Sequence, residues 1–173
     1  NKFIYAKKAF QNLLKLDPHN YEAMGALGTI HIRLSDFDEG IRIYKELLKY
    51  NNKNPRVHLS LGHAQKTIGS RIESETSYLN AIEHFPLCGE AYWSLANLKT
   101  YKFSDEQIQT MESALKDDMH ELEKIQMLFA LGKAHESLEN YDKSFKYYEE
   151  GNWIHRKTLD YNAEENSILI NKT

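Results

Sequence analysis

The sequence predicts an all-α fold in which antiparallel helix hairpins stack into a right-handed α-α superhelix. Three residue series share one period, the long stretches between turns are rich in helix-forming residues, and only three Pro and eight Gly interrupt the 173 residues. Such stretches favour helix over strand, and a period of about 20 to 50 residues is typical of stacked repeats. We therefore expect a single continuous array.

The three series mark equivalent positions in successive units. A Leu followed by a small residue recurs in the first helix of each unit, at steps of 34, 34 and 36 residues: Leu27-Gly28, Leu61-Gly62, Leu95-Ala96 and Leu131-Gly132. A large residue recurs in the second helix, at Phe10, Tyr44, Tyr78, Met111 and Tyr148. A mostly small residue precedes it by about one turn, at Ala6, Gly40, Ser74, Gln107 and Ser144. Small residues let two helices cross closely, and the large side chain fills the space beside the crossing.

The series divide the chain into units. We expect residues 2–20 to form the second helix of a truncated repeat, and residues 160–173 to form a C-terminal capping helix. Between them lie four two-helix repeats, at residues 21–54, 55–88, 89–118 and 125–158.

Local signals support these bounds. Asp17-Pro18 and Phe85-Pro86 end second helices, because the residue before Pro is disfavoured in the α region. We interpret Asp36 as the cap of the second helix in its unit. The third unit lacks one residue in its hairpin turn, near Phe103-Ser104, and an irregular connector follows at residues 117–124. In the tail, an apolar run that ends at Ile170 either covers the last repeat or docks onto a following domain.

The pattern of Leu-Gly, small residue, aromatic residue and Pro resembles the tetratricopeptide repeat over most of the chain. The resemblance implies a solenoid that binds other proteins. In chaperone-binding relatives a basic clamp uses Lys and Asn at fixed places on successive first helices. Gly25 and Thr29 stand at those places in the first full repeat, so we do not expect binding to chaperone C-termini.

A narrower resemblance rests on two segments. The run from Gly89 to Thr100, followed by Phe103-Ser104-Asp105, and the run Phe129–Ala134, followed by Glu150-Gly151-Asn152, are similar to the N-terminal arrays of bacterial tetratricopeptide-sulfotransferase fusion proteins. This resemblance implies a parent enzyme whose phosphosulfate loop would follow Thr173. Residues 1–173 contain no such loop, so we expect no enzymatic activity from them.

Composition excludes several functions. The net charge is −3 and no basic stripe is visible, so we expect no nucleic-acid partner. No apolar run approaches the roughly 20 residues that span a bilayer. The single Cys88 cannot form an internal disulfide and fits a reducing compartment, so we expect a cytoplasmic location. No phosphate-binding loop or metal-ligand spacing is present. We therefore predict no catalytic, cofactor-binding or metal-binding residue, and structural roles for His31 and His135.

Helical phase predicts which side chains line the groove formed by the first helices. The candidates are Arg33, Arg56, Leu59, His63, Trp93, Asn97, Tyr101, Phe129 and Lys133. Exposed aromatic side chains on such a wall are typical anchors for a peptide, although Trp93 would alternatively pack into the next repeat. Our hypothesis is a scaffold that binds a peptide or partner domain. The alternatives are a substrate-delivery module for a sulfotransferase domain after Thr173 and a self-associating structural module.

Overall fold

The computed structural model describes residues 2–158, and these form nine α-helices and no strand. The helices are α1 (Lys2–Leu16), α2 (Tyr21–Arg33), α3 (Phe37–Tyr50), α4 (Pro55–Thr67), α5 (Arg71–His84), α6 (Gly89–Ala96), α7 (Asp105–Ala114), α8 (Glu121–Ser137) and α9 (Tyr141–Thr158). The predicted all-α superhelix of hairpins is confirmed. The expected capping helix at residues 160–173 lies outside the described residues.

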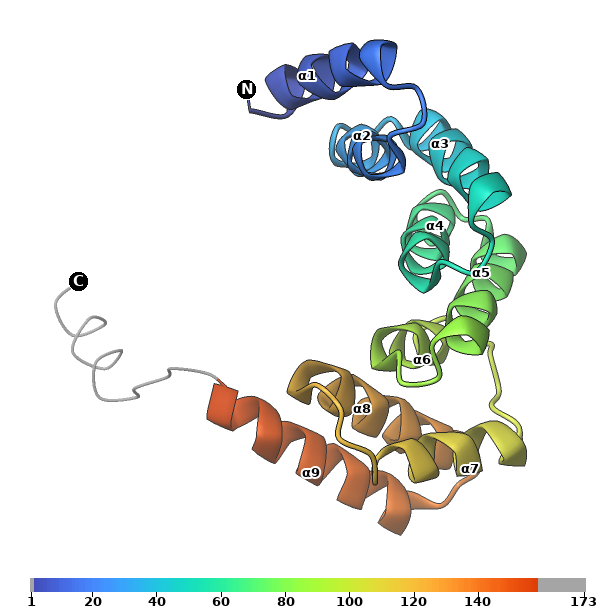
Figure 1. Cartoon of the computed structure of the whole chain (residues 1–173). Helices are drawn as coiled ribbons and strands as arrows, with labels where there is room; N and C mark the ends of the chain where they lie inside the picture. Colours follow the sequence, from blue (N-terminus) through green and yellow to red (C-terminus); the bar gives the residue numbers. More distant parts are fainter. Residues whose placement is uncertain (1, 159–173) are drawn as a thin grey trace, which may run out of the picture.

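The helices follow an arc, and α2, α4, α6 and α8 lie on its inner side (Figure 1). Helices α2, α4 and α8 each pack against the helix that follows, α6 packs mainly against α8, and α1 packs against α2. The inner helices therefore form the wall of a concave groove. None of the described helices combines the length and the apolar character that a bilayer crossing demands.

Short-range hydrogen bonds set the ends of the helices. The Asn20 side chain accepts a bond from the third amide of α2, and Ser104 forms a capping box with Gln107 at the start of α7. Such caps satisfy amides that have no partner within the helix. Asp36 is the N-cap residue of α3, as expected, but its side chain makes no capping bond to the α3 amides, and its carboxylate lies 2.7 Å from His31 Nδ1 instead. This contact lowers the pKa of Asp36.

The predicted close crossings within hairpins are confirmed. A Cβ added at Gly28, Gly62 or Gly132 would lie 2.9, 2.6 or 2.7 Å from the ring of Tyr44, Tyr78 or Tyr148, respectively. These distances are shorter than ordinary van der Waals contact, so each glycine is required by the tyrosine that lies over it. In the third unit, Ala96 and Met111 belong to the same buried core cluster, and the unbranched Met side chain can adapt to the extra methyl group.

The third hairpin differs from the prediction. The sequence suggested one missing residue at the turn, but α6 ends at Ala96 and the connection runs from residue 97 to residue 104. Lys99 there has a positive φ of 62°. The ring of Phe103 packs beside Tyr92 and against the core, so aromatic side chains of the connection occupy space beside the shortened helix. In the fourth hairpin, α8 begins at Glu121, about one turn earlier than expected.

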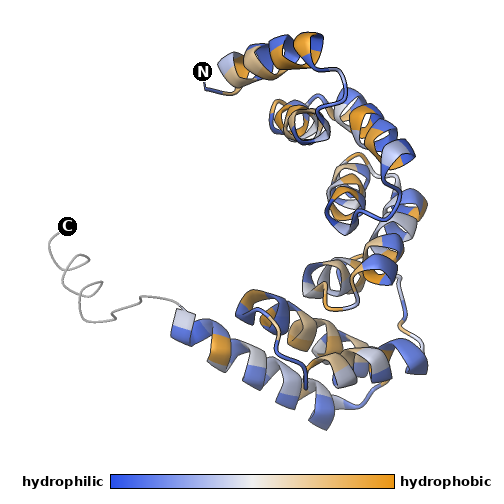
Figure 2. Cartoon of the chain, viewed as in Figure 1, coloured by the Kyte–Doolittle hydropathy of each residue, from blue (hydrophilic) through white to orange (hydrophobic). Residues whose placement is uncertain are grey.

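The densest core lies in the C-terminal half. The large side chains with less than 2% exposure include Tyr92, Leu95, Met111, Leu128 and Leu131, all from α6, α7 or α8. Figure 2 shows that apolar residues lie mainly on the sides of helices that face other helices. The N-terminal hairpins have a smaller core around Tyr44 and Leu61.

Candidate peptide-binding groove

The structure places most of the predicted groove residues on the inner helices. Arg33 lies at the end of α2, three lie on α4 (Arg56, Leu59 and His63), Trp93 lies on α6, and two lie on α8 (Phe129 and Lys133). Arg33 and Arg56 are exposed, while the other five are half-buried. The predicted residues on these helices therefore come from four different hairpins, and their place on a binding wall stays a prediction.

Two predicted residues lie outside these helices. Asn97 is the C-cap of α6, and its side-chain amide donates to the carbonyl of Trp93 at 2.9 Å. Tyr101 lies in the connection between α6 and α7, where its hydroxyl accepts a 2.6 Å bond from Gln107. Burial raises the pKa of Tyr101, and the carboxylate of Glu75 on α5 adds to the effect. The assignment of Tyr101 to a first helix is therefore wrong, because α6 ends before it.

His63 links two hairpins across the wall. Its Nε2 lies 3.0 Å from Glu90 on α6, and its Nδ1 lies 3.0 Å from the hydroxyl of Tyr78. A neutral imidazole that donates to the carboxylate and accepts from the phenol satisfies both contacts. The bond from His63 lowers the pKa of Glu90 below its ordinary value of 4.5. His63 therefore orients Glu90 on the groove wall.

Lys133 also has a partner on the wall. Its ammonium donates to Glu136 at 2.8 Å, and the hydroxyl of Tyr148 donates to the second oxygen of the same carboxylate at 3.0 Å. These bonds, first from Lys133 and then from Tyr148, lower the pKa of Glu136. Both side chains of the pair are partly exposed, so a ligand would meet a preformed ion pair.

Sequence reasoning missed one set of groove atoms, the tyrosine hydroxyls of the second helices. The phenols of Tyr44, Tyr78 and Tyr148 reach Thr29, His63 and Glu136, which belong to first helices. Each ring passes over the glycine described above and ends at the inner wall. The signal that could have revealed them is the recurrence of Tyr opposite Gly, since a purely structural ring needs no hydroxyl.

Trp93 and Phe129 lie against each other between α6 and α8, with ring centroids 5.6 Å apart. Phe129 also approaches Tyr148, at 6.4 Å. The backbone supports this contact, because Gly89 lies directly on the carbonyl of Glu123. The two aromatic side chains therefore form one half-buried patch that spans two hairpins.

Two hollows open where the first helices begin. One, of about 380 Å³, is lined by Tyr21, Glu22, Gly25, Ala26, Leu47, Tyr50, Asn51, Asn54 and Val57. The other, of about 730 Å³, is lined by Pro55, Arg56, Leu59, Ser60, Phe85, Cys88, Glu90, His120 and Glu123. Their α2 and α4 residues correspond at the 34-residue period of the repeat. The two hollows thus occupy equivalent positions in successive repeats. The smaller one has aromatic residues in its wall, and the larger one has charged residues.

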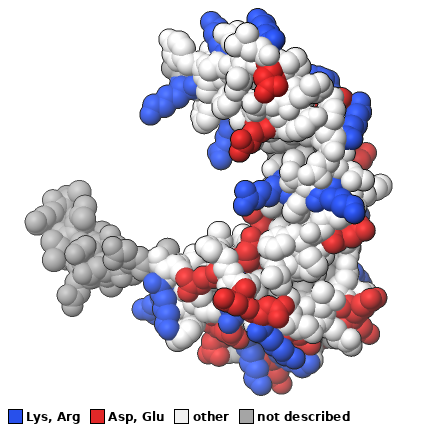
Figure 3. All heavy atoms as spheres, viewed as in Figure 1, with Lys and Arg blue, Asp and Glu red and all other residues white. Residues whose placement is uncertain are grey.

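Charge varies along the arc. Figure 3 shows basic side chains projecting from the inner wall at the level of α4, and acidic side chains further along over the C-terminal helices. Two acidic residues of the inner helices lie close together, because the carboxylate of Glu123 on α8 accepts the amide of Glu90 on α6 at 3.2 Å. The wall therefore offers both signs of charge to a partner.

Comparisons with known proteins agree with this architecture. Residues 2–69 and residues 125–151 match family models described as tetratricopeptide repeat. No curated protein sequence matches the chain.

Solved structures with low sequence identity share the fold. The crystal structure of MamA is 21% identical, with a TM-score of 0.68 and 92% of each chain covered. BtubC from P. vanneervenii is 15% identical, with a TM-score of 0.70, covering 94% of this chain and 76% of that one. A tetratricopeptide repeat protein from Parabacteroides merdae is 18% identical, with a TM-score of 0.66, covering 91% of this chain and 61% of that one.

Proposed function

The chain carries tetratricopeptide repeats, and on that premise we propose that it is a protein-interaction scaffold whose concave groove binds a peptide segment of a partner. The observation that supports the proposal is that the inner helices of successive hairpins, on the concave side of the arc (Figure 1), carry partly exposed aromatic and charged side chains. Half-buried aromatic anchors surrounded by polar groups are typical of protein-binding surfaces. Ordered ion pairs on the wall reduce the entropy lost on binding.

The patch of Trp93 and Phe129 is the proposed anchor. Both rings are partly exposed yet held by packing, so a partner gains apolar contact without first ordering these side chains. The neighbouring Lys133–Glu136 pair offers one donor and one acceptor to a peptide backbone or carboxylate. Together they make a site that selects for an apolar residue next to polar groups.

The test is binding of the full chain to an array of short random peptides. Trp93→Ala and Phe129→Ala should each weaken the peptides that bind wild type, by roughly tenfold or more if the patch is a hot spot. Phe145→Ala is the matched control, since Phe145 is 65% exposed on α9 and outside the proposed anchor. Circular dichroism and urea unfolding would show that each variant is folded. Equal binding by wild type and both anchor variants would remove the groove proposal.

A narrower proposal, supported only by the sequence resemblance of the two segments named above, is that the array belongs to a sulfotransferase-type parent and delivers substrate to it. The coding sequence downstream of Thr173 tests it, because a phosphosulfate-binding loop there is required and a stop codon contradicts it. The self-associating alternative requires a mass above that of one chain, which light scattering coupled to gel filtration measures directly.

A further inference from the structure

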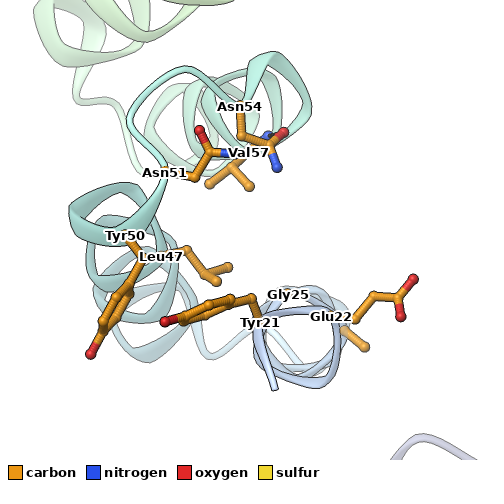
Figure 4. Close-up of a pocket in the computed structure, with 9 residues that line it drawn as sticks. Tyr21, Glu22, Gly25, Leu47, Tyr50, Asn51, Asn54 and Val57 are labelled. Atoms are coloured by element: carbon orange, nitrogen blue, oxygen red, sulfur yellow. Dashed lines mark hydrogen bonds between the residues drawn. The ribbon is translucent and has the colours of Figure 1, made fainter. Parts of the chain in front are cut away.

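The smaller hollow is built from three helices. Tyr21 and Gly25 come from α2, Leu47 and Tyr50 from the end of α3, and Val57 from the start of α4. Figure 4 shows Leu47 and Val57 pointing into the space, with the Tyr21 ring along one side. The rings of Tyr21 and Tyr50 lie 4.8 Å apart and are about half exposed. The floor is therefore apolar and the rim is aromatic.

The α2 side of this hollow lacks a side chain that the other repeats carry. At the 34-residue period, the position of Gly25 is occupied by Leu59 on α4 and Trp93 on α6, and the corresponding residue on α8 is Phe129. Three repeats thus place a bulky apolar side chain where the first full repeat has none. The equivalent hollow on α4 has Leu59 as an apolar lining residue, whereas the α2 hollow has no side chain at that position.

Packing does not require the glycine. A Cβ added at Gly25 would lie 3.7 Å from Leu47 Cδ1, an ordinary contact, whereas Gly28 and Gly40 would both clash with neighbouring side chains. Gly25 lies in the interior of α2 without a positive φ, where glycine is less favourable than alanine. A helix-weakening residue with no packing reason indicates that the open space itself has a use.

The charge beside the hollow is negative. Glu22 is exposed in the first turn of α2 and forms no ion pair with any residue in the described range 2–158. Figure 4 shows its carboxylate directed away from the centre of the hollow, toward its outer side. A ligand that fills the hollow with an apolar group would therefore meet a carboxylate at the next residue.

We propose that this hollow is a specificity subsite for a bound peptide, and that it takes one bulky apolar side chain, such as Leu, Met or Phe, with Lys or Arg next to it at Glu22. The apolar side chain supplies to α2 what Leu59, Trp93 and Phe129 supply to their own repeats. The hollow, of about 380 Å³, is large enough to hold such a side chain. The proposal rests on the groove function above and adds sequence preference to it.

The experiment uses the peptides that bind wild type in the array and measures their Kd by fluorescence anisotropy. Gly25→Leu places the residue of the second repeat into the hollow and should weaken binding roughly 10- to 100-fold. Thr76→Leu, on an exposed position of α5, is the control and should leave Kd unchanged. Gly25→Ala should be folded and intermediate in affinity, so a folding failure of Gly25→Leu would not leave the proposal untested.

A double cycle sharpens the test. Replacing the bulky apolar residue of the peptide by Ala should weaken binding to wild type and have little further effect on Gly25→Leu. Glu22→Gln should weaken only those peptides that carry Lys or Arg, and the loss should shrink as salt is added. The subsite is overturned if neither Gly25→Leu nor Gly25→Ala changes the Kd of the bound peptides. The groove proposal still stands in that case if Trp93→Ala weakens their binding. If no peptide binds wild type, both proposals fall.

Discussion

The boundary between α6 and α8 is packed differently from the two boundaries before it, although the same kind of repeat forms all three. Between α6 and α8, Gly89 lies on the backbone of Glu123, and the rings of Trp93 and Phe129 fill the wall. Between α2 and α4, and again between α4 and α6, hollows remain at the equivalent edge. The comparison indicates that a few positions per repeat decide whether a boundary becomes core or stays open.

The largest expected effect tests whether an open boundary means a weak hairpin. Tyr78 is fully buried within the α4–α5 hairpin, and Tyr78→Ala should cost about 3–5 kcal/mol in the free energy of unfolding because it leaves a cavity. Tyr50→Ala at the half-exposed rim of the hollow should cost less than about 1 kcal/mol. Urea unfolding followed by circular dichroism measures both. Similar losses would mean that the hollow is as tightly packed as the hairpin interior.

The second prediction contrasts two glycines, one at each kind of boundary. A methyl group at Gly89 meets the carbonyl oxygen of Glu123, so Gly89→Ala should destabilise by about 1–3 kcal/mol. Gly25→Ala meets only ordinary contact and should stabilise by about 0.5–1 kcal/mol. Thermal melts of the two variants beside wild type give the comparison. A loss of stability in Gly25→Ala would contradict the view that its space is open.

The third prediction concerns the aromatic patch that closes the last boundary. A double-mutant cycle on Trp93→Ala and Phe129→Ala should give a coupling of about 0.5–1.5 kcal/mol, because the two rings contact each other. The unfolding free energies of wild type, both single variants and the double variant supply the cycle. Additive losses would show that the rings fill separate spaces.

The smallest effect is at the charged link across the second boundary. His63 lowers the pKa of Glu90, so the carboxylate should titrate below 4.5 in wild type and closer to 4.5 in His63→Ala, as followed by carboxyl carbon shifts in NMR. A lowered pKa in the folded state adds stability above the unfolded pKa, and that stability is lost as pH falls through the folded pKa. For a half-exposed pair it should be below about 1 kcal/mol. An unchanged Glu90 titration in His63→Ala would contradict the link.

Much of the fold follows from local patterns. The Leu-Gly pairs and the large residues of the second helices identify the hairpins because each pattern records a contact within about one repeat. The early end of α6 was not predictable in this way, because residues 97–101 keep a helical phase in the sequence. In the structure, the connection that follows α6 instead places Phe103 beside Tyr92. Because of that error, Tyr101 was predicted to lie on a first helix, whereas it lies in the connection after α6.

The groove was predictable by position and less so by chemistry. Phase alone places Leu59, Trp93 and Phe129 on first helices, and their role in binding stays a prediction. The partners of His63 and Lys133 depend on how successive hairpins turn relative to one another, which no single sequence window encodes. The hollow beside Gly25 was not predictable either, because its lining residues come from three helices that meet only in the folded structure.

The tyrosines that reach from the second helices to the first helices are natural spectroscopic probes of binding. Burial raises the pKa of Tyr78 and of Tyr148 to about 12, yet their oxygens bond to His63 and Glu136 on the wall. A ligand that binds near His63 or Glu136 would change the hydrogen bonds of these phenols without contacting their rings. Shifts of the ring-carbon NMR resonances of Tyr44, Tyr78 and Tyr148 would then show which hairpins the bound ligand reaches.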